Sequence, residues 1–397
     1  MTKEELFFIK ILSDFLNERQ TVAPVETLDW NIIVKLAHAH QTSGILYYQC
    51  GEFMPSELEK FQCTVYAKEQ MIHSKRVKLT NQIFDKLCEN KIPFLTFKGL
   101  NVAKFYPVMS LRTMGDCDIL VHPEDKEKAD EVFRSFGYSC TDYGTMEWAY
   151  NNKDNVAFEL HHNLMYNQVY NYDMHKEFMK LSWDYAKTDD NVHYYLDWNY
   201  HFVFLILHLR KHFIKSGVGF RQFMDVALVA TKCDLDWDWI NKKLEELDVS
   251  KFANICFALC EYCFKLKIPT TVSPLSDTDY IEACKVILDN GTFGSENRNN
   301  MINGVIFAMR DKKKPKHYIV KRFISIFFPS YKILSNLKKY SFLKGKPYLL
   351  PIAWIYRVFS CITRGRVKVV FSSLKLYKAL TKENTEKQIN KLNKWGL

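Results

Sequence analysis

The stretch LRTMGDCDILVHPED, residues 111–125, decides the fold class of this chain. It places Asp116 and Asp118 at the start of the apolar, β-branched run CDILV, which is typical of a buried strand. Because side chains i and i+2 of a strand share one face, both carboxylates are expected to point the same way. Like charges this close repel each other unless a cation lies between them. Carboxylate oxygens suit Mg²⁺ or Mn²⁺, although Asp-x-Asp pairs also occur in turns, where each side chain caps its own backbone.

The flanking segments predict a small mixed sheet with helices. HPEDKEKADEVFRSFGY reads as a helix with Pro123 in its first turn and Gly137 as its stop. IPFLTFKG reads as a short strand before the Asp-x-Asp strand, and YSCTDYG, MEWAYNN and NVAFELHHNL read as three strands after it. The expected fold class is therefore α+β.

Four segments are expected along the chain. Apolar spacing of i, i+3, i+4 predicts an N-terminal helical segment over residues 1–90 and a helical domain over 198–300. The strand-rich core occupies 91–197, and a basic, amphipathic C-terminal extension occupies 301–397.

Composition predicts a cytoplasmic location. The chain has 397 residues, of which 47% are hydrophobic and 25% charged, enough for two or three domains with real cores. MTKEELFFIKILSDFL reads as an amphipathic helix rather than a signal peptide, and no run is long enough to cross a membrane. The scattered cysteines indicate reduced thiols. Cys256, Cys260 and Cys263 have a spacing used by iron–sulfur enzymes, but their helical periodicity favours packed core cysteines.

Charge is distributed unevenly. Residues 301–397 hold 22 Lys or Arg against three acids, a net charge of +19, whereas residues 1–300 hold 33 basic and 42 acidic residues, a net charge of −9. Residues 312–382 contain no acidic side chain and many large apolar ones. This segment is expected either to cover the core with solvated basic faces or to lie on an anionic membrane surface. Nucleic-acid binding is less favoured, because a phosphate surface does not need so many apolar residues.

Further polar residues join the two aspartates. Glu159, in AFELHH, supplies a third carboxylate on a strand that is expected to lie beside the Asp-x-Asp strand. His161 shares its strand face and is expected to join the nucleotide site. The segment Lys98–Gly99 ends one strand and opens a short helix, where backbone N–H groups favour phosphate. A strand, a Gly turn and helix, an Asp-x-Asp strand and a later acid form the layout of a polymerase-β-like nucleotidyl transfer site. Such sites use two metal ions for in-line displacement at the α-phosphorus.

The pattern FKG-x7-P-x4-R-x3-D-x-D-I-L with ELHHNL resembles the bacterial, largely uncharacterised nucleotidyltransferase family proteins of the polymerase-β-like superfamily. The likeness extends to WNIIVKLAHAHQTSGILY, HLRKHFIKSGVGFRQFMDVALV and KPYLLPIAWIYRVF, so that it spans most of the chain. It implies a polymerase-β-like core, a small mixed sheet with helices, flanked by helical segments.

The resemblance also implies residue roles. Asp116 and Asp118 would bind both metal ions, and Glu159 would bind the one that activates the acceptor hydroxyl. Lys98 and Gly99 would hold the triphosphate, and a neighbouring arginine, named below, would steady its charge. The chain departs from the usual signature in having Glu as its third acid, Lys-Gly in place of Gly-Gly or Gly-Ser, and 16 residues between the glycine and the first aspartate.

The remaining expected site residues are basic. The arginine that would steady phosphate charge is Arg112. His208 and His212 lie on one helical stripe with His201, and Arg221 follows the glycine-containing segment SGVGF. They are expected either to reach over the site and bind nucleotide or acceptor, or to form a core-facing histidine row beside an i, i+4 salt bridge to an aspartate.

The expected function is metal-dependent transfer of a nucleoside monophosphate from an NTP to a hydroxyl, with release of pyrophosphate. The acceptor is left open among a sugar, a lipid-linked glycan precursor, a metabolite and a protein. The competing class is a catalytically silent, nucleotide-binding or membrane-associated scaffold with the same fold. The expected location is the cytoplasm, with the inner face of the plasma membrane as the peripheral alternative.

Overall fold

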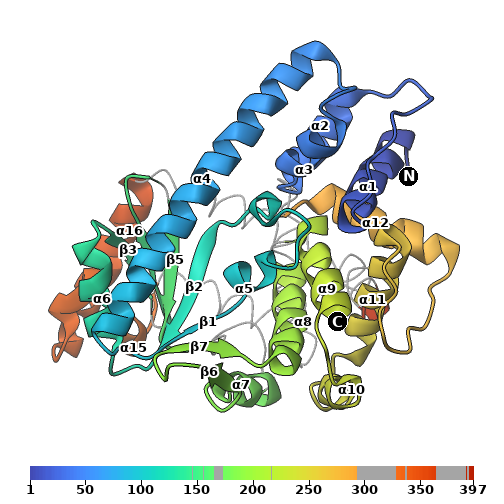
Figure 1. Ribbon diagram of the computed structural model, residues 1–397. Helices are drawn as coiled ribbons and strands as arrows, with labels where there is room; N and C mark the ends of the chain where they lie inside the picture. Colours follow the sequence, from blue (N-terminus) through green and yellow to red (C-terminus); the bar gives the residue numbers. More distant parts are fainter. Residues whose placement is uncertain are drawn as a thin grey trace.

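The fold is described from a computed structural model. It combines one mixed sheet with a group of helices, and a long helix runs from one part to the other (Figure 1). The expected α+β class is confirmed. The structure describes residues 1–144, 146–154, 156–164, 173–215, 217–292, 328–335, 338–363, 390 and 393–397.

The sheet in the described residues has seven strands in the order β3-β4-β5-β2-β1-β7-β6. The predicted Asp-x-Asp strand is β2, and the three strands expected after the following helix are β3, β4 and β5, in that order. Their bounds are β1 Phe94–Thr96, β2 Asp116–Val121, β3 Ser139–Tyr143, β4 Glu147–Asn151, β5 Ala157–His161, β6 Ala186–Thr188 and β7 His193–Leu196.

The centre of the sheet carries the acidic residues. Strand β2 pairs in parallel with β5, and this register sets Asp118 opposite Glu159. On its other side β2 pairs antiparallel with β1. Strands thus pair with β2 on both sides, and five of its six residues are buried. Asp116, the first residue of the strand, is half-buried. The sheet therefore presents both acids at neighbouring strands with a defined register.

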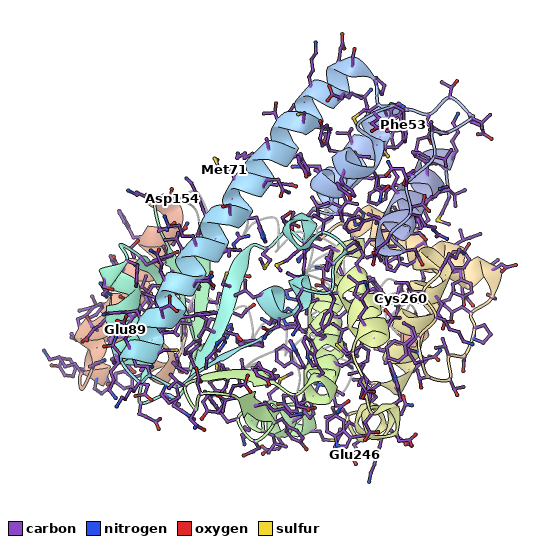
Figure 2. All side chains as sticks on the ribbon, in the orientation of Figure 1. Phe53, Met71, Glu89, Asp154, Glu246 and Cys260 are labelled. Carbon is purple, nitrogen blue, oxygen red and sulfur yellow. The ribbon has the colours of Figure 1, made fainter. Side chains whose placement is uncertain are left out.

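Helices α4 (Ser56–Glu89) and α6 (Lys126–Ser135) pack with the sheet around one hydrophobic core. This core includes Ile83 and Leu87 of α4 and Phe133 of α6. Helix α4 continues well beyond the sheet, and Met71, near its middle, has an exposed side chain (Figure 2). Glycine follows α6 as expected, since Gly137 has a φ of 77°.

The other helices share a second, larger core. Phe8 of α1 packs against Phe220 of α9, and Cys260 of α11 lies within this helical part (Figure 2). The N-terminal helices and those after residue 198 thus enclose one core, while the domain boundaries stay a prediction. The helix bounds are α1 Lys3–Leu16, α2 Trp30–Ala39, α3 Ser43–Cys50, α5 Gly99–Ala103, η1 Met109–Leu111, α7 Asp173–Lys180, α8 Trp198–Lys215, α9 Phe220–Lys232, α10 Trp237–Glu246, α11 Ser250–Phe264 and α12 Asp277–Asn290.

The predicted core cysteines are confirmed. Cys256, Cys260 and Cys263 are all buried in the large core on α11. The pKa values of their thiols are raised, by burial for Cys256 and Cys260 and by a contact with the Cys284 sulfur for Cys263. Neutral thiols in an apolar helix face pack as small hydrophobic groups.

Most of the basic C-terminal extension lies outside the described residues. Its described helices are α15 Tyr331–Leu334, η2 Lys338–Leu343, η3 Pro347–Leu349 and α16 Leu350–Thr363. They surround a small cluster of their own that includes Leu343 and Ala353. Within the described parts of the chain, none of the helices combines the length and apolar character needed to cross a membrane.

Candidate functional site

One cavity of about 260 Å³ gathers every residue that the sequence pointed to. It lies over the open ends of β2 and β5 and is closed on the other side by α8 and α9. The roles of these residues stay predictions, but their positions are fixed by the fold. They are Lys98, Gly99, Arg112, Asp116, Asp118, Glu159, His161, His208, His212 and Arg221.

Asp118, Glu159 and His161 form the centre of the cavity. Each offers one ligand atom, and these atoms lie within 4.8 Å of one another. The parallel register of β2 and β5 brings the two carboxylates together, and His161 follows Glu159 by two residues on the same face. Among the described residues this is the group with the donors and the spacing to hold a metal ion.

Two cationic groups surround Asp118. Lys98 Nζ donates a hydrogen bond to Asp118 Oδ1 at 2.7 Å, and His161 Nε2 lies 2.9 Å from the same oxygen. Burial raises the pKa of Asp118, but Lys98 and His161 outweigh burial and hold it well below its usual range. Burial lowers the pKa of His161, whereas its hydrogen bonds to Asp118, Glu147 and Glu159 raise it to about 10. The imidazole is therefore protonated in this state and, with the ammonium, balances the carboxylates.

Asp116 has a different environment from Asp118. It lines the same cavity but is not one of the three residues whose ligand atoms converge. Burial, with repulsion from Asp118 and Glu159, raises the pKa of Asp116 to about 6. A cation in the cavity would stabilise the ionised form of a carboxyl group whose pKa is raised by burial and by neighbouring carboxylates.

Lys98 has an unusual backbone conformation. Its φ of 55° and ψ of −120° lie in a region that favours glycine, and the resemblance noted from the sequence implies glycine at this position. The Lys98 N–H donates to His201 Nε2 at 2.9 Å. Burial and the positive charge of Lys98 lower the pKa of His201 to about 3, so the ring stays neutral and accepts this hydrogen bond. The predicted histidine stripe thus supplies a support for the turn that aims Lys98 at Asp118.

Gly99 has no room for a side chain. A Cβ atom there would lie 2.9 Å from Met114 Sδ and 3.3 Å from Arg112 Nη1. The start of α5 can therefore approach the loop before β2 closely. Glycine at this position therefore lets the backbone at the start of α5 lie close to the Arg112 guanidinium.

Arg112 is held by α9. Its Nε and Nη2 donate to the two carboxylate oxygens of Asp225, each at 2.8 Å, and the Tyr106 hydroxyl donates to Asp225 Oδ1 at 2.7 Å. Asp225 thus takes its ion pair from Arg112 rather than from Arg221, the i, i+4 neighbour considered from the sequence. Arg112 Nη1 is buried and has no hydrogen-bond partner in the described structure. That N–H group lines the cavity and is suited to an anionic oxygen.

Arg221, His208 and His212 close the cavity from the helical side. Arg221 Nη1 donates to the Thr113 carbonyl oxygen at 3.1 Å, and burial lowers its pKa. His208 Nε2 and His212 Nε2 lie 2.9 Å apart, and burial lowers the pKa of His208 well below its ordinary value. His208 and His212 of the predicted stripe line the cavity, whereas His201 is buried behind the Lys98 turn, and the roles of all three stay predictions.

The model of a family described as uncharacterised nucleotidyltransferase matches residues 26–265. This match covers more than half of the chain. The chain belongs to this nucleotidyltransferase family. The resemblance inferred from the sequence is therefore confirmed at the level of the family. No curated protein and no solved structure gave a match.

The family match includes much of the helical part of the chain. It begins before α2 and ends just after α11, so it contains α8 and α9 as well as the sheet. Helix α9 carries Arg221 and Asp225, which line the cavity. The helices that flank the sheet are therefore part of the family unit.

Glu147 also lines the cavity and was missed by sequence reasoning. Strand β4 pairs antiparallel with β5 and sets Glu147 opposite His161. Glu147 Oε2 lies 3.2 Å from His161 Nδ1, and this hydrogen bond lowers the pKa of Glu147. The alternation of polar or small residues with large apolar ones in EWAYN indicated which strand face Glu147 occupies. It did not indicate the register that sets Glu147 opposite His161.

The residues of this cavity fit a hard divalent cation. Two carboxylates and one imidazole converge, and burial together with repulsion from Asp118 and Glu159 raises the pKa of Asp116 beside them. Carboxylate oxygens favour Mg²⁺ and Mn²⁺, and Mn²⁺ also accepts imidazole. Asp118, Glu159 and His161 would hold the ion, with Asp116 beside them. His161 would bind it after losing its proton to water.

Proposed function

We propose that this protein is a metal-dependent nucleotidyltransferase that moves a nucleoside monophosphate from an NTP to a hydroxyl group of a second substrate. One observation carries the proposal: the parallel register of β2 and β5 sets Asp118 and Glu159 side by side in a cavity. The family of nucleotidyltransferases to which the chain belongs supports the same reaction class.

The cavity has complementary parts for this chemistry. Its acids lie on β2 and β5, and Lys98, Arg112 and Arg221 line the same cavity. Arg112 Nη1 and Arg221 Nε have no hydrogen-bond partner in the described structure and are suited to triphosphate oxygens. A bound divalent cation would lower the charge on the phosphates and polarise them.

In the proposed reaction the acceptor hydroxyl oxygen attacks the α-phosphorus and forms a new P–O bond. The bond between the α-phosphorus and the bridging oxygen of the β-phosphate breaks, and pyrophosphate leaves with that electron pair. The hydroxyl proton passes to the Glu159 carboxylate and then to water. Arg112 and Arg221 hold the leaving pyrophosphate, because guanidinium groups bind phosphate oxygens in a fixed geometry.

The test follows both the label and the leaving group. The full chain is incubated with Mg²⁺ or Mn²⁺, each α-labelled NTP and cell extract, and labelled products and pyrophosphate are measured. Glu159→Gln should reduce turnover by about a hundredfold or more. Glu127→Gln, at an exposed position on α6, is the control and should retain turnover. If NTPs bind but no extract supports pyrophosphate release, the chain is the catalytically silent, nucleotide-binding alternative instead.

A second function, attachment to an anionic membrane surface, is favoured by the outer face of α16. Ile352 is 56% exposed and Ile355 69% exposed, and Tyr356 and Phe359 continue this face at helical spacing. Ala353 is fully buried, so the helix packs with one side and presents large apolar groups on the other. This face belongs to the segment 301–397, whose net charge is +19. An apolar face in so basic a segment has the composition of a helix that lies in an anionic lipid interface.

A further inference from the structure

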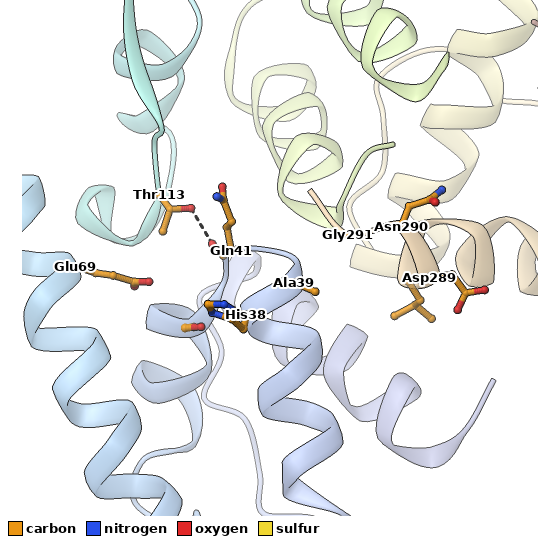
Figure 3. Close-up of a pocket in the computed structure, with 10 residues that line it drawn as sticks. His38, Ala39, Gln41, Glu69, Thr113, Asp289, Asn290 and Gly291 are labelled. Atoms are coloured by element: carbon orange, nitrogen blue, oxygen red, sulfur yellow. Dashed lines mark hydrogen bonds between the residues drawn. The ribbon is translucent and has the colours of Figure 1, made fainter. Parts of the chain in front are cut away.

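A second cavity lies beside the proposed catalytic one. Its volume is about 430 Å³, within the range of small-molecule sites. Helices α2, α4 and α12 and the loop before β2 form its walls, and Figure 3 shows the lining side chains. No residue assigned above to the transfer of the nucleotide lines it.

The two cavities share a thin wall. Thr113 lines this second pocket, whereas its neighbours Arg112 and Met114 line the catalytic cavity. In the same way Gly291 faces the pocket and Thr292 faces the catalytic cavity. Consecutive residues on opposite sides mean that single stretches of backbone separate the two spaces.

Hydrogen bonds hold this wall in place. Thr113 Oγ1 donates to the Gln41 carbonyl oxygen at 2.8 Å, shown by the dashed line in Figure 3. The Thr113 carbonyl accepts from Arg221, and the Thr292 N–H donates to the Ala39 carbonyl at 2.9 Å. A molecule in the pocket therefore lies against backbone that is hydrogen-bonded to Arg221 of the catalytic cavity.

The pocket favours positive charge. Helices α2 and α12 both end at it, with Ala39 and Asn290 as their last residues, and helix C-termini carry partial negative charge. The Glu69 carboxylate points to it from α4, and Asp289 lies at its exposed rim (Figure 3). Its lining includes neither Lys nor Arg in the part of the chain that the structure describes, whereas the catalytic cavity has four.

Two acceptor atoms at the pocket lack partners. Glu69 Oε2 and Gln41 Oε1 are buried without a hydrogen bond in the described structure. Burial raises the pKa of Glu69 to about 7, although a contact with the Gly44 N–H at the start of α3 lowers it. Buried acceptors of this kind are usually satisfied, and a ligand with N–H donors would satisfy both.

We propose that this pocket binds the ammonium group of a small, hydroxyl-bearing amine, and that this amine is the acceptor of the nucleotidyl group. The acceptor role rests on the proposed function. The ammonium group donates to Glu69 and Gln41, and a shift of the backbone at Thr113 would let a hydroxyl of the same molecule reach the catalytic acids. The catalytic cavity takes the polyanionic NTP, so each cavity receives the substrate of opposite charge.

The experiment compares matched amines and neutral compounds by calorimetric titration of the full chain without NTP. The pairs are glucosamine and N-acetylglucosamine, ethanolamine and ethylene glycol, and 4-amino-1-butanol and 1,4-butanediol. At least one amine should bind tenfold or more tightly than its neutral partner. Glu69→Gln should remove that preference, while Glu57→Gln, at an exposed position on the same helix, should retain it. Thermal melting of each variant checks that it is folded.

Two results would overturn the assignment of the pocket. One is that no amine binds better than its neutral partner. The other is that Glu69→Gln weakens Mg²⁺–NTP binding tenfold, because the pocket would then hold the nucleoside. Pyrophosphate release is measured separately with the amines that bind. If amines bind as expected but none supports release, the acceptor role and the proposed function fail while the cation site stands.

Discussion

The Lys98 ammonium and the Asp118 carboxylate form a buried ion pair, with Nζ and Oδ1 2.7 Å apart. Sequence reasoning assigned these residues to different tasks, Lys98 to the triphosphate and Asp118 to the metal ion. In the structure they neutralise each other, with His161 on the same carboxylate oxygen. Binding of a cation at Asp118 would release Lys98 towards phosphate oxygens, so the two tasks are coupled by one contact.

Asp116→Asn and Asp118→Asn should both abolish metal-dependent NTP turnover but change stability in opposite directions. Asp116→Asn removes a carboxylate whose pKa is raised by burial and by Asp118 and Glu159, so the melting temperature of the metal-free protein should rise. Asp118→Asn leaves Lys98 and His161 without their shared partner and should destabilise the protein by about 3 kcal/mol. Calorimetric melting without metal measures both effects. Equal melting temperatures for the two variants would contradict this account of the charges.

Lys98→Gly should be more stable than Lys98→Ala by about 1 kcal/mol, because both lose the ammonium but only alanine keeps the cost of a positive φ. Denaturant unfolding of the two variants gives this difference directly. Both variants should also raise the KM for NTP, since neither can contact the triphosphate. Equal stability would show that the backbone at this position is not strained.

The sequence predicted which acids share a strand face and that the strand of Glu159 runs beside the Asp-x-Asp strand, but it did not predict the register between the two strands. The spacing i, i+2 placed Asp116 with Asp118 and Glu159 with His161, because side-chain direction in a strand follows from sequence alone. The register that sets Asp118 opposite Glu159 depends on how β2 and β5 pair across the sheet. The local hydrophobic pattern constrains that register without fixing it.

Long-range ion pairs show the same limit. The sequence offered Arg221 as the i, i+4 partner of Asp225, but Arg112 takes both carboxylate oxygens from 113 positions away. A helix places i, i+4 neighbours side by side, yet tertiary packing decides which cation is closer. The positive φ of Lys98 was equally hidden, because only the family's usual glycine pointed to it.

The stability of the protein should fall as the pH decreases from about 6.5 to about 4, in part because of His40. Burial lowers the pKa of His40 to about 4 from 6.5, and its Nδ1 accepts the Phe220 N–H at 3.1 Å. Between these pH values the unfolded chain binds a proton that the folded chain excludes, so acid favours unfolding, by up to about 3 kcal/mol. The contribution is complete above the unfolded pKa.

The variant His40→Asn tests this contribution, because its side-chain oxygen can accept the Phe220 N–H without titrating. The free energy of unfolding is measured for both proteins at several pH values from 4 to 7. The advantage of the wild type over the variant should shrink steadily as the pH falls. A constant difference across this range would assign the acid sensitivity to other groups.

Binding to anionic vesicles should depend on the outer face of α16. Ile352 and Ile355 are exposed, so replacing both with Ser removes apolar surface from the lipid contact and little from the folded protein. The double variant should bind phosphatidylglycerol vesicles about tenfold or more weakly than wild type in co-sedimentation. Salt at about 0.5 M should weaken the wild type as well, because screening reduces the attraction of the basic segment. Val25→Ser with Met71→Ser, at exposed apolar positions elsewhere, should bind as the wild type does. If the intact protein ignores these vesicles at low salt, the apolar face of α16 serves another contact and the basic segment is structural.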